Sequence, residues 1–408
     1  MIPRVLIIAG SDSGGGAGIQ ADIKTVTMLG GHAMTAITAI TAQNTLGVQA
    51  VHPVPVEMVI AQIDSVVGDI GVDAVKIGMI GSAETANAVA DRLEALVGVP
   101  IVFDPVIVAT SGDVLADEAT IAAFGRLMRI ATLVTPNLPE LIALEHHLPS
   151  VRPEPVEGLL PAVGAEKNGA STGSARTEES ALSISRILGV PLLVKGGHGE
   201  SDEIVDRLVY PDGEVRRWTA PRIDTTSTHG TGCTLASAIA TYLARGTALV
   251  PAVARARQFV RLAIRDAPGL GQGHGPMAQQ SVRLDLGPGA RLNQVTVAAT
   301  DYVASCAFYR ALGLRQIVAT DDEHYARFEA SGGATLWVEK GARPTVFFEC
   351  EDLDAEVRRL QEAGMKFDQL PVEQDWLWRE ARLTDPAGNA VCLYQADENR
   401  RFPPWRLP

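Results

Sequence analysis

Cysteine is scarce in this chain of 408 residues, which contains only four. Cys233, Cys306, Cys350 and Cys392 are scattered, and no two of them form a C-x-x-C pair. Paired cysteines at short spacing are the usual sign of a zinc ribbon or of a disulfide framework. The sequence therefore predicts neither kind of stabilisation, and each domain must depend on its own hydrophobic core.

Basic residues are outnumbered, with 35 Lys and Arg against 48 Asp and Glu and a net charge of −13. This balance disfavours nucleic-acid binding through a basic surface. The apolar runs are too short or too interrupted to span a bilayer. Pro3 and Arg4 lead straight into an apolar run, which is not the pattern of a signal peptide. We therefore expect a cytoplasmic protein with neither nucleic-acid nor membrane partners.

Two common nucleotide-binding motifs are also missing. There is no G-x-x-x-x-G-K-[ST] loop, and the residue three positions after Gly16 is Ile19, so the dinucleotide fingerprint is incomplete. Instead, the apolar run Val5–Ala9 predicts a buried strand, followed by a loop of Gly and Ser and a helix over Ile19–Leu29. Asp22 and Gln43 supply polar groups that could recognise a heterocycle.

The most informative segment is HGTGCTLASA, from His229 to Ala238. Gly230, Thr231 and Gly232 immediately precede an apolar helix. The glycines let backbone N–H groups turn toward one point, and the helix N-terminus adds partial positive charge. Cys233 lies in the first helical turn, where a thiolate is expected to be stabilised. The segment predicts a cavity for a small anion and indicates phosphoryl transfer.

Strands and helices alternate over residues 1–277. The pattern predicts helices such as Ser82–Leu96 and Ile121–Arg129. The predicted strands are Val5–Ala9, Ala74–Ile77, Ile101–Phe103, Leu133–Val134 and Leu192–Val194. Such alternation favours an α/β fold with a mostly parallel sheet covered on both faces. Ligands of such sheets bind beyond the carboxyl ends of the strands. Residues at or just past predicted strand ends are Gly10, Lys76–Gly78, Asp104, Asn137 and Lys195.

Seven motifs in residues 1–277 together resemble the hydroxymethylpyrimidine/phosphomethylpyrimidine kinases of thiamine synthesis, in the ribokinase-like superfamily. They are AGSDSGGGAGIQADIKT, TAITAQNTLGVQ, VKIGMIGS, DPVIVATSGD, TPNLPE, VKGGH and THGTGCTLASA, in this order. The resemblance implies phosphorylation of an aminopyrimidine's hydroxymethyl group by ATP with Mg²⁺. It also implies phosphorylation of the monophosphate to the diphosphate, and we expect a homodimer.

The resemblance assigns roles to the positions that match the family's motifs. The catalytic, phosphoryl-binding positions are Gly230, Thr231, Gly232 and Cys233. The positions expected to face the pyrimidine are Gly10, Asp22, Gln43 and Met79. ATP phosphates are expected near Lys195 and Asn137, and Mg²⁺ near Asp104 and Glu140, directly or through water. Two roles for Cys233 stay open at this point, a general base or a group that only shapes the anion cavity.

Two segments interrupt the kinase-like pattern. Residues 150–178 are rich in Pro, Gly, Ser and Ala without a sustained period, and we interpret them as a disordered, mobile surface insertion. A functional lid is the alternative interpretation. Residues 278–290 continue a Gly/Pro-rich stretch and predict a linker. Residues 398–408 are expected to form a tail.

The C-terminal part repeats itself. Val295–Val297, Asp301 and Gly313 are matched by Val346–Phe348, Asp352 and Gly364 at the same offset. Both aspartates precede segments with apolar helical spacing, and strand-like runs follow each segment. The pattern predicts an α+β domain built from two βαβββ units, which is a duplication.

Residues 291–397 resemble the glyoxalase/bleomycin-resistance (vicinal oxygen chelate) family through SCAFYRALGL and LTDPAGNAVCLYQ. Metal-binding members place His or Glu on the inner strands, where this chain has Gln294, Thr345 and Cys392, leaving Glu339. One carboxylate is inadequate for a divalent metal. We therefore expect a metal-free ligand-binding or docking module. Residues Trp337, Trp376 and Trp378 could line a pocket or belong to the core.

Three functions stay open for the whole chain. The first is a pyrimidine kinase with an appended small-molecule-binding domain. The second is a pyridoxal or sugar kinase of the same superfamily, which AGSDSGGGAGIQAD and Cys233 disfavour. The third is a binding or resistance protein with a degenerate kinase half. The intact Asp104, Lys195 and Gly230–Cys233 loop argue against the third.

Overall fold

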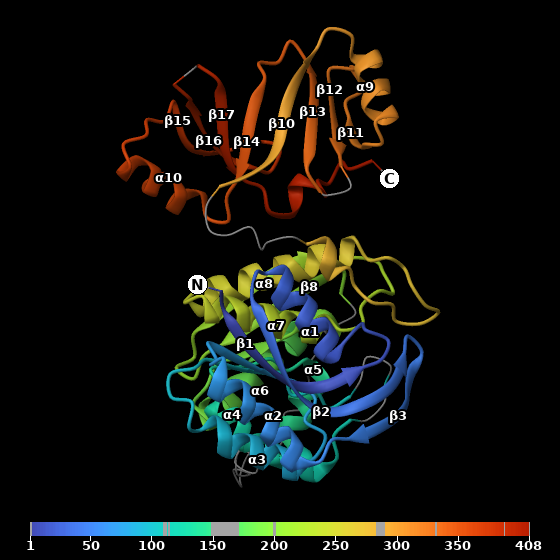
Figure 1. The fold of residues 1–408 in the computed structure, drawn as a ribbon, viewed down its shortest axis with the longest axis vertical. Helices are drawn as coiled ribbons and strands as arrows, with labels where there is room; N and C mark the ends of the chain where they lie inside the picture. The colour runs from blue at the N-terminus through green and yellow to red at the C-terminus, as the bar shows by residue number, and fades with distance from the viewer. Residues whose placement is uncertain are drawn as a thin grey trace, which may run out of the picture. The chain divides into compact units, whose positions relative to one another are not determined.

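The computed structural model describes residues 2–108, 112, 115–147, 171–198, 201–282, 290–330, 333–386 and 388–407. The chain forms two compact units, Met1–Asp285 and Leu286–Pro408 (Figure 1). Within these described ranges, no helix combines the length and the apolar character needed to cross a membrane.

A nine-stranded sheet forms the centre of the first unit, in the order β3-β2-β1-β4-β5-β6-β7-β8-β9. The six central strands run parallel to one another, and they are β2, β1, β4, β5, β6 and β7. Strand β3 at one edge and the pair β8 and β9 at the other edge are joined to the sheet by antiparallel pairing. The strands are β1 (Arg4–Asp12), β2 (His32–Asn44), β3 (Gly47–Pro53), β4 (Ala74–Ile77), β5 (Ile101–Phe103), β6 (Leu133–Val134), β7 (Leu192–Val194), β8 (Glu203–Val209) and β9 (Val215–Pro221). The predicted strands are therefore confirmed, with β4 to β7 at the predicted bounds.

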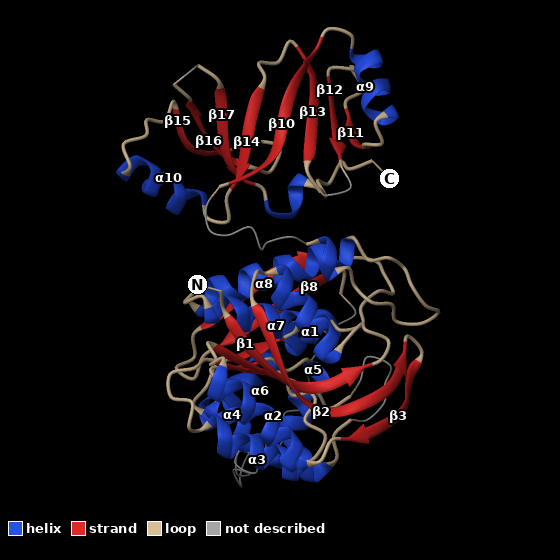
Figure 2. Ribbon diagram, viewed as in Figure 1, coloured by secondary structure: helices blue, strands red, loops and turns tan. Residues whose placement is uncertain are grey.

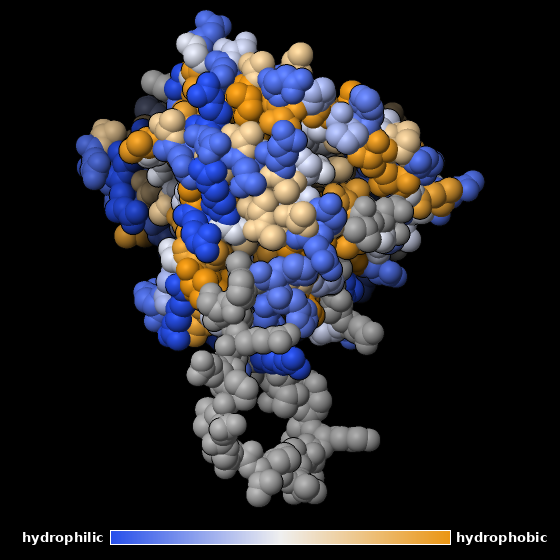
Figure 3. Space-filling model, turned by 90° about the horizontal axis from the view of Figure 1, so that it is seen from below, coloured by the Kyte–Doolittle hydropathy of each residue, from blue (hydrophilic) through white to orange (hydrophobic). Residues whose placement is uncertain are grey.

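Helices cover both faces of this sheet (Figure 2). One layer consists of α1 (Gly18–Met28), α7 (Thr231–Ala244) and α8 (Leu249–Arg265). The other consists of α2 (Val56–Asp69), α3 (Ala83–Leu93), α4 (Glu118–Ile130), α5 (Leu138–His147) and α6 (Ser171–Leu188). Because both faces are covered, the central strand β1 is buried continuously from Val5 to Ala9. The predicted α/β class is confirmed. Polar and apolar side chains are interspersed on the surface at the α3 end of this unit (Figure 3).

Helix α6 corrects the predicted insertion. Residues 150–170 lie outside the described residues, but 171–178 begin α6 rather than belonging to a mobile segment. The Glu178 carboxylate accepts hydrogen bonds from Arg207 at 3.1 Å and from Arg217 at 2.7 Å. Composition alone hid this helix, because its polar first turns precede the buried apolar positions Ala181 and Ile184.

The first unit also continues past residue 277, where the sequence suggested its end. Met277, Ala278, Gln279 and Val282 are buried. The Gln279 side-chain amide donates to Thr234 Oγ1 at 3.1 Å, and η2 (Gln279–Ser281) packs against α1 and α8. Gly and Pro on either side of this short segment suggested a linker, but its own side chains are part of the core.

The second unit is an eight-stranded sheet in the order β11-β12-β13-β10-β14-β17-β16-β15. Its first half is β10 (Arg291–Ala299), α9 (Tyr302–Ala311), β11 (Arg315–Ala319), β12 (Tyr325–Glu329) and β13 (Thr335–Lys340). Its second half is β14 (Thr345–Glu349), α10 (Leu353–Glu362), β15 (Gln369–Glu373), β16 (Arg379–Thr384) and β17 (Ala390–Gln395). Two βαβββ units are thus confirmed.

The duplication reaches the helix caps. Asp301 accepts a hydrogen bond from the Ala304 N–H, and Asp352 accepts one from the Ala355 N–H, each at 2.9 Å. Both aspartates therefore act as N-caps of equivalent helices, as their sequence positions predicted.

The predicted tail is part of the second unit. After η3 (Asp397–Arg400), Arg401 and Arg406 form ion pairs with the buried Glu329 at 2.5 and 3.1 Å. The Leu407 N–H donates to the Ile317 carbonyl at 2.8 Å. The arginines of the expected tail thus neutralise a buried carboxylate.

The buried segment after residue 277 gives a stability prediction. A chain ending at residue 277 should melt about 5 °C lower than one ending at residue 285. Burial of Val282 contributes about 2 kcal/mol and the Gln279 hydrogen bond about 1 kcal/mol. Thermal denaturation followed by circular dichroism would measure the difference. The exposed substitution Gln280→Ala in the longer chain is the control, and equal melting temperatures of the two chains would contradict the assignment.

Candidate functional site

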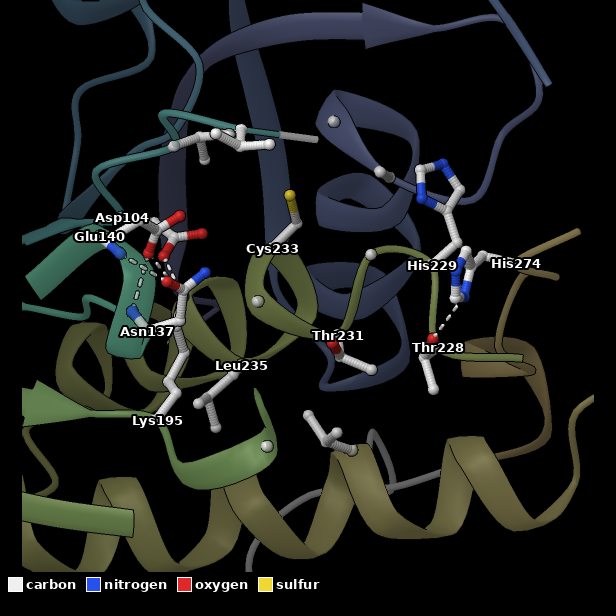
Figure 4. A pocket seen from close by; sticks show the side chains of 18 of the residues that line it. Asp104, Asn137, Glu140, Lys195, Thr228, His229, Thr231, Cys233, Leu235 and His274 are labelled. Carbon is white, nitrogen blue, oxygen red and sulfur yellow. Dashed lines mark hydrogen bonds and ion pairs between the residues drawn. The ribbon is translucent and has the colours of Figure 1, made fainter. Parts of the chain in front are cut away.

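A cavity of about 810 Å³ lies in the first unit, next to the carboxyl ends of the parallel strands and the N-terminus of α7. Figure 4 shows it from close by. The predicted site residues that line it are Gly10, Gln43, Met79, Asp104, Asn137, Glu140, Lys195, Gly230, Thr231, Gly232 and Cys233. The structure therefore brings together every predicted site residue except Asp22.

The anion-binding loop is built by close packing of backbone on backbone. Gly230 is the N-cap of α7 and has a φ of 82°, which favours glycine. A Cβ atom at this position would lie 2.0 Å from the Gly16 carbonyl oxygen. Only glycine fits, and the α7 N-terminus is consequently held at the cavity wall, where its N–H groups favour an anion.

Cys233 follows this loop and points into the cavity (Figure 4). Burial is the main influence on its thiol and raises the pKa to about 11, against the opposing effect of Lys76. This direction is opposite to that of a stabilised thiolate, because loss of hydration together with the nearby Asp22 and Asp104 outweighs the effect of Lys76.

Two carboxylates and one ammonium form a charged cluster at one end of the cavity (Figure 4). Lys195 Nζ lies 2.7 Å from Asp104 Oδ1 and 3.7 Å from Glu140 Oε2. The Thr135 hydroxyl also donates to Asp104 Oδ1, at 2.9 Å. Burial raises the pKa of Glu140 to about 7, although Lys195 acts in the opposite direction.

Local structure fixes Glu140 in this cluster. The Asn137 N–H donates to the Glu140 carboxylate, and the Glu140 N–H donates to the Asn137 side chain, each at 2.8 Å. This reciprocal pairing at the start of α5 is that of a capping box. Asn137 thus contributes by positioning Glu140.

The donor set suits Mg²⁺ held partly by a nucleotide. Among the described residues, no group of three or more His, Cys, Asp or Glu side chains could hold a metal. Mg²⁺ commonly takes only one or two carboxylates, with phosphates and waters as the other ligands. At Gly232 a Cβ atom would lie 3.1 Å from Lys195 Nζ and 3.3 Å from Asp104 Oδ2, so glycine keeps space beside the charges.

Asp22 does not face the cavity. Its side chain is fully buried between α1, β4 and α7, where it accepts from Lys76 Nζ at 2.8 Å and from the Ser237 hydroxyl at 2.7 Å. The pKa of Lys76 is raised by this pairing despite burial. Asp22 thus lies behind the cavity wall with each oxygen bonded to a protein group, and its contact with the pyrimidine stays a prediction.

Sequence reasoning missed the contact between Asp12 and His229, both in the cavity wall. Asp12 accepts hydrogen bonds from the N–H groups of Gly14 (2.8 Å), Gly16 (3.0 Å) and Ala17 (2.8 Å). His229 Nε2 lies 2.9 Å from Asp12 Oδ2. An Asp directly before a glycine-rich loop was the available signal, since such a side chain can bond the following backbone.

The part of the cavity wall beyond Lys195 and Leu235 is apolar and was also missed (Figure 4). It combines side chains from β8, β9, α7 and α8 with the loop after β9, and several arginines lie at its edge. The apolar residues are Ile204, Ala220, Ile223, Leu235, Val260 and Ile264. Such a surface can accept the flat face of a nucleobase.

In the second unit, three residues stand where metal-binding relatives are expected to have ligands, and all three lie on inner strands of the sheet. They are Gln294 on β10, Thr345 on β14 and Cys392 on β17. Gln294 accepts from the Thr335 hydroxyl at 2.7 Å, and Cys392 is fully buried. Glu339 lies 3.7 Å from His324 Nε2. Trp378 is fully buried and stacks on Tyr394 with ring centroids 4.5 Å apart, so it belongs to the core. The metal-free character of this unit stays a prediction.

Comparison with known proteins agrees with this geometry. Residues 12–155 and 168–278 match the phosphomethylpyrimidine kinase family model, and residues 291–393 match the glyoxalase/bleomycin resistance protein/dioxygenase superfamily. The hydroxymethylpyrimidine/phosphomethylpyrimidine kinase of Rhizobium meliloti is 45% identical over 68% of this chain and 97% of its own length. The bifunctional protein ThiED of Geobacter sulfurreducens is 44% identical over 67% of this chain, which spans only 51% of that relative.

Among solved structures, the pyridoxal kinase of Staphylococcus aureus in complex with AMP-PCP and pyridoxal superposes with a TM-score of 0.58. It is 29% identical, and the match covers 70% of this chain and 96% of that one. The first unit thus has the fold of the small-molecule kinases of the ribokinase-like class. More specifically, the chain belongs to the phosphomethylpyrimidine kinase family and carries a C-terminal glyoxalase-type domain.

The contact at Gly230 yields a prediction. Gly230→Ala should lower kcat by about 10²-fold, because the Cβ atom would push the α7 N-terminus away from the Gly16 carbonyl. Gly246→Ala is a matched control, since Gly246 has a φ of 79° with no atom within 4 Å of a Cβ. Both variants share the backbone strain of about 1–3 kcal/mol, but only the first should lose activity. Equal kinase rates in the two variants would refute the steric argument.

Proposed function

We propose that this chain transfers the γ-phosphoryl group of ATP to the hydroxymethyl group of an aminopyrimidine. The observation that carries the proposal is that three groups of residues line one cavity. They are the Gly230–Cys233 loop, the charged cluster around Asp104, and the two side chains Gln43, which is polar, and Met79, which is apolar. Phosphoryl transfer requires mainly positioning and charge stabilisation, which such an arrangement supplies.

Charged side chains make the Asp104 end of the cavity suitable for a nucleotide. Asp104 and Glu140 would hold Mg²⁺, which when bound neutralises phosphate charge. Lys195 offers an ammonium to the phosphates, and the α7 N-terminus offers N–H groups to the transferring group. The apolar surface around Leu235 and Val260 would take the adenine ring.

The shape and the hydrogen-bonding groups of the cavity around Gln43 and Met79 suit the acceptor. A Cβ atom at Gly10 would lie 3.0 Å from Met79 Sδ, so glycine leaves the Met79 thioether room to lie against a flat ring. The Gln43 amide carries both a donor and an acceptor, which match an amino group beside a ring nitrogen. Cys233 lies between the two ends, where the acceptor hydroxyl must lose its proton.

Further phosphorylation of the monophosphate by the same cavity belongs to this proposal, as does a ligand-binding or docking role for the C-terminal domain. The homodimer predicted from sequence and the cytoplasmic location stay predictions. Pyridoxal is the rival acceptor, because the structurally similar Staphylococcus aureus enzyme is a pyridoxal kinase.

The acceptor assignment can be tested by ADP release from the full chain with Mg²⁺ and ATP. Hydroxymethylpyrimidine should be the preferred acceptor over pyridoxal and ribose, because the Gln43 amide can pair with the amino group and the adjacent ring nitrogen. A specificity constant for pyridoxal tenfold or more above that for hydroxymethylpyrimidine would overturn the assignment.

The Cys233 thiol gives a pH prediction. If Cys233 is the base, kcat should rise about tenfold per pH unit between 7 and 9, because the thiolate fraction grows until the pH reaches a pKa near 11. Cys233→Asp should give a flat profile over this range, since a carboxylate is already ionised. Cys233→Ala should lower kcat about 10²-fold with little change in KM for ATP. A flat wild-type profile and near-native kcat in Cys233→Ala would leave only the cavity-shaping role.

A further inference from the structure

We infer that Asp12 and His229 are positioning residues that fix which way the Gln43 amide faces, and that they thereby set acceptor specificity. The inference rests on the proposed function, because it concerns how the same cavity distinguishes an aminopyrimidine from similar rings. Asp12 and His229 are not among the residues to which the family resemblance gave a role.

The Asp12 carboxylate is almost entirely buried. Burial acts to raise its pKa, but the His229 contact and the Ala17 and Gly14 N–H groups hold the pKa below the usual value. Asp12 is therefore ionised at neutral pH and can only accept hydrogen bonds. His229 Nε2, 2.9 Å from Asp12 Oδ2, must accordingly carry a proton. Otherwise a nitrogen lone pair would face a carboxylate.

The Gln43 amide touches His229 on one side and Thr41 on the other. Gln43 Nε2 lies 3.3 Å from His229 Nε2, and Gln43 Oε1 lies 3.1 Å from Thr41 Oγ1. With a protonated His229 Nε2, this orientation sets two N–H donors against each other. In this orientation, the Thr41 hydroxyl would also have to donate its single proton to both the Gln43 oxygen and the Ser11 carbonyl, which lies 2.9 Å from Thr41 Oγ1.

Turning the amide by 180° removes the contact between two donors and frees the Thr41 proton for Ser11, while the heavy-atom positions stay in place. The His229 Nε2–H donates mainly to Asp12 at 2.9 Å, and the Gln43 oxygen becomes the second, weaker acceptor of that proton in a three-centre bond. The Gln43 NH₂ group donates to the Thr41 oxygen, whose own proton goes to Ser11. The hydrogen-bonding pattern thus assigns the oxygen to the His229 side and the NH₂ group to the Thr41 side.

The direction of the Gln43 amide determines how an acceptor ring can bind. The remaining oxygen lone pair can accept from an exocyclic amino group, and the remaining N–H can donate to an adjacent ring nitrogen. A ring must then enter with its amino group toward His229, which also determines where its hydroxymethyl group points. A ring without the amino group leaves the oxygen unpaired, and such a loss is costly in a site built to hydrogen-bond.

Backbone packing keeps His229 in this place. The His229 N–H donates to the Gly275 carbonyl at 3.1 Å, and a Cβ atom at Gly16 would lie 2.4 Å from the His229 ring. The first contact fixes the His229 backbone, and the second places the Gly16 loop directly against one side of the imidazole.

The test compares hydroxymethylpyrimidine with its analogue lacking the 4-amino group, using the full chain, Mg²⁺ and ATP. The wild type should prefer the amino compound in kcat/KM, and His229→Phe should reduce that preference about tenfold, mainly through KM for the amino compound. KM for ATP should change less than about twofold, since the nucleotide end is untouched. His229→Gln can still donate a proton to Asp12 and should restore the preference. His32→Phe, at an exposed position at the start of β2, is the matched control.

The outcomes separate the two levels of the argument. An inactive wild type with hydroxymethylpyrimidine overturns the proposed function and this inference with it. An active wild type whose preference is unchanged in His229→Phe overturns the inference alone, as does an equal loss of activity toward both compounds. If His229→Phe fails to fold, nitrogen-15 NMR of the wild-type imidazole decides at neutral pH. A protonated Nε2 supports the inference, and an unprotonated Nε2 overturns it.

Discussion

The contact between Gly230 and the Gly16 carbonyl is the constraint on which the site depends. The two loops come from opposite ends of the first unit's sequence, and a side chain at Gly230 would overlap the other loop's backbone. Their approach brings the N-terminus of α7 to the end of β1, so the anion-binding groups and the acceptor-binding groups share one wall. Asp12 adds hydrogen bonds that keep the first loop in the required conformation. A single tight backbone contact thus sets the distance between the two halves of the proposed reaction.

Charge is distributed in this site so that each buried ion has a partner. Lys76 and Asp22 neutralise each other behind the cavity, and Lys195 is shared between Asp104 and Glu140 at its wall. The first pair is fully buried and already hydrogen-bonded, which makes it structural. The second lies in the cavity, where Lys195 can exchange a carboxylate for a phosphate. The same residue types therefore serve different purposes according to whether a ligand can reach them.

Much of the fold could be predicted from the sequence because its signals are local. Short apolar runs gave β4 to β7 at their observed bounds, and the repeated Asp301 and Asp352 gave both helix caps of the second unit. The errors arose where composition competed with tertiary contacts. The first turns of α6, the segment around Gln279 and the C-terminal residues around Arg401 are polar or rich in small residues. Glu178 near the start of α6, Gln279 and Arg401 each bond a partner distant in sequence, which no local pattern reveals.

The site shows the same division between local and non-local information. Motifs located the loop at Gly230 and the residues around Asp104, because these follow directly from strand and helix ends. They did not reveal the orientation of Asp22, which depends on Lys76 and Ser237 from two other elements. They also missed His229 as a functional residue although it begins the most informative motif. Its role becomes visible only when Asp12, Gln43 and Thr41 are considered together, because the direction of one amide follows from the charge of Asp12 and from the protons of His229 and Thr41.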